Sequence, residues 1–181
     1  MALFHEGQVA GALLWRQPTI TEEGYTLHLG DAEDAPTIAR LRWQGSFTTR
    51  ALAETGAGSW TFERSGSWRP SVTIRDAHSG AECGLYQSKG PGGTLTLADG
   101  WTFGWSPTDF WRANWQWTGR DGQLLAKFTD QRRFVRQQGL VEVPAIAWSA
   151  PELALLVILG WYLMLLQAKD NTAVIAATTS H

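Results

Sequence analysis

The chain has 181 residues, with 15 Lys and Arg against 17 Asp and Glu and a formal net charge of −2. This length suits one domain or a small pair, and the balanced charge argues against a general nucleic-acid binder, which needs a basic excess. Apolar residues make up 44% of the chain, enough to bury a core, and a single cysteine excludes an intrachain disulfide. The N-terminal residues show no basic stretch before an apolar run, so we expect no secretory signal and a cytoplasmic location.

Apolar and polar residues alternate with a period of two through most of the first 144 residues. The clearest case is 110–118, in which Trp111, Trp115 and Trp117 share one side of a predicted strand and polar residues the other. Side chains alternate between the faces of a strand, so each such segment has one buried and one wet side, as in antiparallel sheets. Asp-Gly and Pro-Gly-Gly turns separate about ten to twelve short strands. The pattern predicts a sandwich or barrel with these tryptophans in its core.

The period changes near the C terminus, where residues 153–166 contain neither a charged group nor an amide. Ser149 and Glu152 have the spacing of a capping box, and polar residues follow the apolar run. The sequence therefore predicts a helix over about 150–167. This helix is apolar all round, so it must be buried on every side.

Two environments could bury this helix. In a membrane, residues 153–166 would span about 21 Å of a hydrocarbon core of about 30 Å. Starting the span at residue 145 gives enough length, but it places Glu152 in lipid at a cost of roughly 2.5–3.5 kcal/mol. The interior of a closed sheet of about twelve strands is the other environment, because such a barrel is wide enough to need filling. We predict the second, with core residues Leu156, Val157, Leu159 and Trp161; a tail-anchored protein using 145–166 stays open as an alternative.

Many short predicted antiparallel strands are followed by one uncharged helix near the C terminus, and three stretches carry this pattern most clearly: 99–105, 115–128 and 139–143. The pattern resembles the tubby-like β-barrel superfamily, which includes the LURP-one-related proteins and the phospholipid scramblases. The resemblance implies a single domain over 1–181: a mainly β, closed antiparallel barrel of about twelve strands around a central hydrophobic C-terminal helix. It also implies a role at membrane lipids. The chain has no phosphoinositide-site motif and lacks the acidic calcium segment of scramblases, so no functional residue is carried over, and the LURP-one-related branch is the nearer comparison.

The densest basic cluster consists of Lys127, Arg132, Arg133 and Arg136. A turn near Gln131 would bring these side chains together on two adjacent strands. They are candidate contacts for an anionic headgroup, since each basic group near an anionic surface contributes about 1 kcal/mol. The other interpretation is a charged outer face that keeps a barrel soluble. The partners implied are an anionic membrane surface or a phosphoinositide, which would make the location peripheral to a membrane.

No residue set in the sequence indicates catalysis, a metal or another cofactor. The four histidines lack ligand spacing, and Cys83 has no second cysteine. The acidic loop of Asp31, Glu33 and Asp34 lacks the EF-hand pattern, and no nucleophile elbow occurs. We therefore predict a non-enzymatic binding or scaffold module for anionic lipid headgroups. A lipocalin-like carrier of a hydrophobic ligand is a further alternative.

Overall fold

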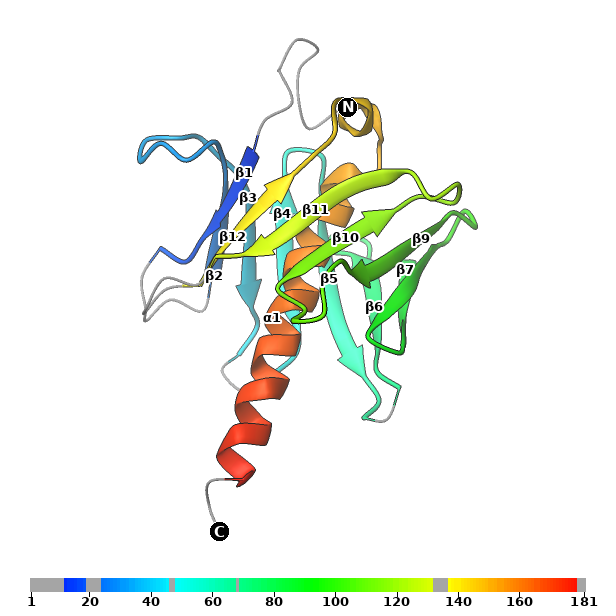
Figure 1. The fold of residues 1–181 in the computed structure, drawn as a ribbon. Helices are drawn as coiled ribbons and strands as arrows, with labels where there is room; N and C mark the ends of the chain where they lie inside the picture. The colour runs from blue at the N-terminus through cyan, green and yellow to red at the C-terminus, as the bar shows by residue number, and fades with distance from the viewer. Residues whose placement is uncertain (1–11, 19–23, 46–47, 68, 132–136, 179–181) are drawn as a thin grey trace.

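The computed structural model describes residues 12–18, 24–45, 48–67, 69–131 and 137–178. Within them the chain forms twelve β-strands, a short 3-10 helix η1 and one long helix α1 (Figure 1). The strands are β1 (Ala12–Arg16), β2 (Gly24–Leu29), β3 (Thr37–Trp43), β4 (Ala51–Thr55), β5 (Gly58–Ser65), β6 (Ser71–Asp76), β7 (Glu82–Lys89), β8 (Gly92–Leu97), β9 (Thr102–Pro107), β10 (Asn114–Thr118), β11 (Leu124–Asp130) and β12 (Gln138–Glu142); η1 is Ala145–Ser149 and α1 is Leu153–Thr178.

The twelve strands close into one antiparallel barrel. Each strand pairs with its neighbours in sequence, and β1 pairs with β12, with Ala12 opposite Glu142 and Arg16 opposite Gln138. The predicted closed barrel is therefore confirmed. Because every strand runs against the previous one, the connecting loops alternate between the two ends of the barrel. We call the end where α1 begins the entry end and the end where α1 leaves the exit end.

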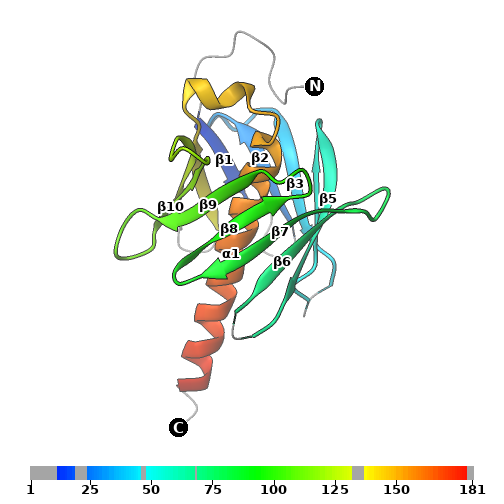
Figure 2. The same cartoon turned by 90° about the vertical axis from the view of Figure 1, so that its right-hand side faces the viewer.

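Helix α1 runs inside the barrel, as Figures 1 and 2 show from two directions. The predicted core residues Leu156, Val157, Leu159 and Trp161 are buried, as are Trp115 and Trp117 on the wall. The Trp161 ring stacks on Trp15, with centroids 5.8 Å apart and planes at 5°. An added Cβ at Gly139 of β12 would collide with the same Trp161 ring, so this strand glycine makes room for the helix.

The structure also shows where the apolar run of 153–166 is buried. Within the described residues, Leu153–Thr172 is the one helical window long and apolar enough to cross a membrane, and 78% of it is buried inside the barrel. Burial of large apolar side chains, each giving roughly 1.5–3 kcal/mol, makes α1 a major contribution to the core. A lipocalin-like carrier needs a hollow barrel, and here α1 runs through the barrel interior.

The structure corrects the prediction at Trp111 and at both ends of the helix. Trp111 is 85% exposed instead of buried, because it belongs to the β9–β10 loop and β10 starts only at Asn114. Arg112 has a φ of 56°, which breaks the alternation that the sequence pattern extended back to residue 110.

The helix is also longer than predicted, since it continues from Leu153 to Thr178. The polar residues after Leu166 mark the place where α1 leaves the barrel, and residues such as Gln167 and Lys169 continue a helix readily. At the other end, the Ser149 hydroxyl donates to the Ile146 carbonyl within η1. It therefore does not cap α1, which explains the late start.

Candidate functional site

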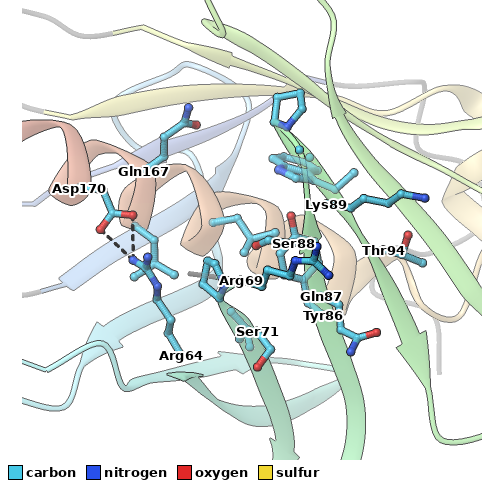
Figure 3. A pocket seen from close by; sticks show the side chains of 18 of the residues that line it. Arg64, Arg69, Ser71, Tyr86, Gln87, Ser88, Lys89, Thr94, Gln167 and Asp170 are labelled. Atoms are coloured by element: carbon cyan, nitrogen blue, oxygen red, sulfur yellow. Dashed lines mark hydrogen bonds and ion pairs between the residues drawn. The ribbon is translucent and has the colours of Figure 1, made fainter. Parts of the chain in front are cut away.

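The helix does not lie midway between the barrel walls. It approaches β11, β10 and β3 most closely. On the opposite side, between its exit-end half and β6–β8, a cavity of about 900 Å³ opens to solvent. Figure 3 shows Arg69, Gln87 and Lys89 on the strand side of this cavity and Gln167 and Asp170 on the helix side. We call it the exit pocket.

Four basic side chains line the exit pocket. Arg64 comes from the end of β5, Arg69 from the β5–β6 loop, Lys89 from the end of β7 and Arg112 from the β9–β10 loop. Among the described residues that line the pocket, Asp170 is the single carboxylate and Glu is absent. No ion pair joins Arg69, Lys89 or Arg112 to another described residue. The pocket is therefore strongly positive, although the chain as a whole carries −2.

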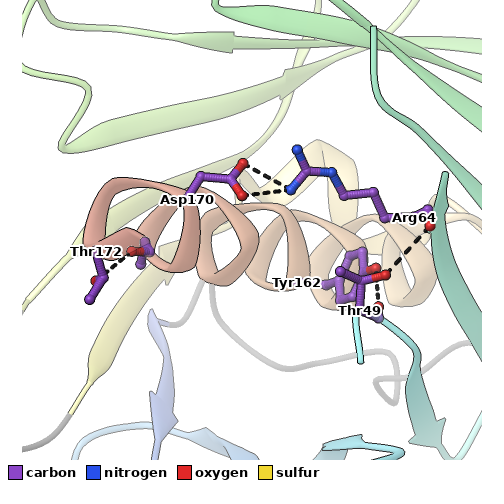
Figure 4. A network of polar contacts seen from close by, with 6 residues as sticks. Thr49, Arg64, Tyr162, Asp170 and Thr172 are labelled. Atoms are coloured by element: carbon purple, nitrogen blue, oxygen red, sulfur yellow. Dashed lines mark hydrogen bonds and ion pairs between the residues drawn. The ribbon is translucent and has the colours of Figure 1, made fainter. Parts of the chain in front are cut away.

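Arg64 is fixed in place by contacts at both ends of the residue (Figure 4). Its Nη1 donates to both carboxylate oxygens of Asp170 at 2.8 Å. Its carbonyl accepts from the Thr49 hydroxyl at 3.4 Å, while the Thr49 carbonyl accepts from the Tyr162 hydroxyl at 2.5 Å. Tyr162 and Asp170 both belong to α1, so the helix positions the Arg64 side of the pocket.

Aromatic rings form the inner wall of the exit pocket. Tyr86, Trp105 and Trp115 line it and are all buried. Trp105 and Trp115 stack, with centroids 5.2 Å apart and planes at 10°. Burial raises the pKa of Tyr86 to about 12, so its phenol stays protonated near neutral pH. The pocket thus combines an apolar, uncharged interior with cations around it.

Charge is distributed unevenly between the two ends of the barrel. The β2–β3 loop at the entry end carries Asp31, Glu33 and Asp34, all exposed. Among the described residues, the loops at the exit end carry Arg50, Arg69 and Arg112, with Asp109 as their one acidic residue. An antiparallel barrel gathers alternate loops at one end, so charges far apart in sequence add up there.

The sequence-predicted headgroup contacts do not line the exit pocket within the part of the chain that the structure describes. Lys127 lies on β11, and its Nζ is 3.9 Å from a carboxylate oxygen of Glu142 on β12. Arg132, Arg133 and Arg136 lie outside the described residues. The charges that the structure does bring together were missed because they are single residues on separate segments. Summing charge over alternate loops of the predicted barrel would have found Arg69 and Arg112.

The pocket does not resemble a metal centre. Across residues 12–18, 24–45, 48–67, 69–131 and 137–178, no three His, Cys, Asp or Glu side chains gather as a metal site would require. Four basic groups would also repel a cation. Guanidinium and ammonium donors instead suit phosphate or carboxylate oxygens, which arginine binds in a two-pronged geometry.

Comparison of the chain with protein-family models, with curated proteins and with solved structures finds no match. The resemblance to the tubby-like superfamily therefore stays a prediction. The closed barrel and its buried apolar helix are observed directly.

Proposed function

We propose that the protein is a non-enzymatic binding module that holds an anionic group, such as a phosphate-bearing headgroup, in the exit pocket. One observation carries this proposal: four cations surround the cavity, and the one carboxylate among them is already paired with Arg64. The ligand would gain charge-assisted hydrogen bonds from Arg69, Lys89 and Arg112, which have no other anionic partner among the described residues.

The lining residues favour binding over catalysis. Asp170 is held in an ion pair, and the Tyr86 phenol titrates only near pH 12. Neither is a good general base near neutrality, and the described lining residues include no cysteine or histidine. The resemblance to lipid-associated barrels and the charge of the exit end both agree with an anionic membrane headgroup as the source of the ligand.

Lipid binding is tested by co-sedimentation with phosphatidylcholine vesicles that contain or lack phosphatidylinositol 4,5-bisphosphate. Inositol hexakisphosphate, measured by calorimetry, tests the same pocket without a membrane. A triple variant with Arg69→Gln, Lys89→Gln and Arg112→Gln is expected to bind both roughly a hundredfold more weakly, since each basic group contributes about 1 kcal/mol. Raising the salt concentration should weaken binding of the unmodified chain as well.

The matched control removes the same charge outside the pocket, with Arg40→Gln, Arg120→Gln and Lys127→Gln. This variant should keep most of the binding, and it also tests the sequence-predicted contact at Lys127. Equal losses in the two triple variants would show that the exit pocket is not the site. Equal binding to both vesicle types, with no binding of inositol hexakisphosphate, would refute the proposed function.

A further inference from the structure

The β9–β10 loop, 108–113, carries the two most exposed large apolar side chains of the described residues. Phe110 is 89% exposed and Trp111 is 85% exposed. The rings contact each other edge to face, with centroids 5.6 Å apart and planes at 85°. Aromatic rings of this size bury a large area when they find a partner surface, so their exposure is costly in water.

The exposure does not come from a loose loop. The Asp109 carboxylate accepts from the Ala113 and Asn114 backbone N–H groups at 3.0 and 2.8 Å. The Trp115 indole N–H donates to the Arg112 carbonyl at 2.9 Å. The loop backbone is thus held by its own hydrogen bonds, while the two aromatic side chains remain directed away from the core.

The loop also borders the exit pocket. Arg112 follows Trp111 directly and lines the cavity together with Arg69 and Lys89. All of these residues lie at the exit end, from which α1 also projects (Figure 1). The exposed aromatic rings and the cations without an ion-pair partner among the described residues therefore lie at one end of the molecule. Tryptophan side chains are enriched where a membrane meets water, and cations are drawn to an anionic headgroup layer.

We propose that the barrel docks on an anionic membrane surface with Phe110 and Trp111 inserted at headgroup level, which turns the exit pocket toward the lipid headgroups. This inference rests on the proposed function and adds the docking element and the orientation. Charge complementarity favours a membrane over a symmetric pair of copies, because two exit ends in contact would oppose the same cations. Sedimentation velocity, below, tests a head-to-tail contact with the acidic entry end of a second copy. The basic residue beside the aromatic pair, Arg112, then lies in the headgroup layer, where its charge is favourable.

The first test compares loop variants on phosphatidylcholine vesicles containing phosphatidylinositol 4,5-bisphosphate. Phe110→Ala with Trp111→Ala should weaken vesicle binding ~10-fold or more, given the area that two buried aromatic rings contribute. The control variant, Trp101→Ala with Ile146→Ala, removes two exposed apolar side chains at the entry end and should bind like the unmodified chain. Calorimetry with inositol hexakisphosphate should give the same affinity for all three proteins.

The second test reports insertion directly and does not depend on affinity. A polarity-sensitive fluorophore is attached at Phe110→Cys or, as the control, at Trp101→Cys, each in a Cys83→Ser background. Fluorescence of the Phe110→Cys conjugate should rise and shift to the blue on the anionic vesicles. The Trp101→Cys conjugate should change little, because the entry end faces away from the membrane.

The outcomes separate this inference from the proposed function. The docking inference alone is overturned by three results together. Inositol hexakisphosphate binds normally, the fluorescence of the Phe110→Cys conjugate does not change on vesicles, and the loop variant keeps the vesicle affinity of the unmodified chain. The expected hundredfold loss of anion affinity in the pocket triple variant, together with a responsive Phe110→Cys conjugate, supports both. Sedimentation velocity could instead show that the unmodified chain self-associates, that the loop variant does not, and that neither binds vesicles. This result would assign the loop to contact with a second copy and overturn the membrane inference. A conjugate that responds equally to neutral vesicles would overturn the requirement for an anionic surface.

Discussion

The packing of α1 against the barrel wall predicts that a Gly→Ala substitution in this helix destabilises the protein, whereas such a substitution usually stabilises a helix. Gly160 lies in α1 among buried rings of the wall. An added Cβ would lie 2.5 Å from Phe128 Cζ and 2.8 Å from Trp117 Nε1. Glycine in a helix interior is about 1 kcal/mol less favourable than alanine, so an ordinary Gly→Ala change would stabilise the helix. Here the added methyl group meets atoms that have little room to move.

The neighbouring rings determine the magnitude. Phe128 and Trp117 are both buried, and Trp105 contacts both, with centroids 5.2 Å and 4.8 Å away. Overpacking of a filled core costs about 1–3 kcal/mol, which outweighs the gain in helix propensity. The 2.5 Å approach to Phe128 places the cost in the upper part of this range, at about 2–3 kcal/mol. After the gain of about 1 kcal/mol in helix propensity is subtracted, we expect Gly160→Ala to lower the free energy of unfolding by about 1–2 kcal/mol, or the melting temperature by roughly 2–8 °C for a chain of this size.

Urea unfolding followed by tryptophan fluorescence, with thermal melting followed by circular dichroism, would measure this change. Gly56→Ala is the control, because no atom lies within 4 Å of its added Cβ. Its stability should stay close to that of the unmodified chain. A Gly160→Ala protein as stable as the control, or more stable, would mean that α1 does not pack on β10 and β11 as described.

Three further predictions follow from the same structure. Asp170→Asn removes the carboxylate paired with Arg64, so the affinity for inositol hexakisphosphate in calorimetry should rise about fivefold, and a lower affinity would contradict the pocket assignment. Leu156→Ala should lower the free energy of unfolding by about 2–5 kcal/mol in urea, because Leu156 is fully buried, whereas a loss near zero would place it outside the core. Burial raises the pKa of Tyr25 and Tyr86 from 10.0 to about 12. The phenols of the unfolded chain therefore lose their protons at a lower pH than those of the folded chain. The free energy of unfolding should fall as the pH rises from 10 through about 12. Ultraviolet titration should show phenolate forming in the folded chain only well above the pH at which it forms in urea.

The strand pattern could be predicted because almost every strand has one face on α1 or on its neighbours in the core. Val72 and Ile74 of β6 are buried and Thr73 between them is only partly buried, which is the alternation that the sequence displays. The alternation rule failed at Trp111. An apolar residue that continues the alternation just before a strand cannot be told apart in sequence from one inside the strand. Only the loop geometry, with Arg112 at positive φ, takes it out of the sheet.

The site was harder to predict than the fold. A scan along the chain detects contiguous charge and so selected 127–136. The basic residues of the exit pocket are isolated in sequence, from Arg64 to Arg112, and become neighbours only when the barrel closes. Asp170 could be assigned to the pocket only once the helix was known to continue past residue 167, since its position depends on α1 leaving the barrel as a helix.

The separation of charge along the barrel resolves an apparent conflict in the proposal. A chain with a net charge of −2 spread evenly over its surface would be repelled by an anionic membrane. With acidic residues such as Asp31 and Glu33 at the entry end and Arg69, Lys89 and Arg112 at the exit end, repulsion and attraction act on opposite ends of the molecule. On the proposed function, an anionic surface would turn the exit end toward itself before contact, at distances within about 10 Å of the surface. The net charge alone argues against membrane binding, whereas its distribution agrees with the proposed orientation, in which the aromatic loop and the pocket would both meet the headgroups.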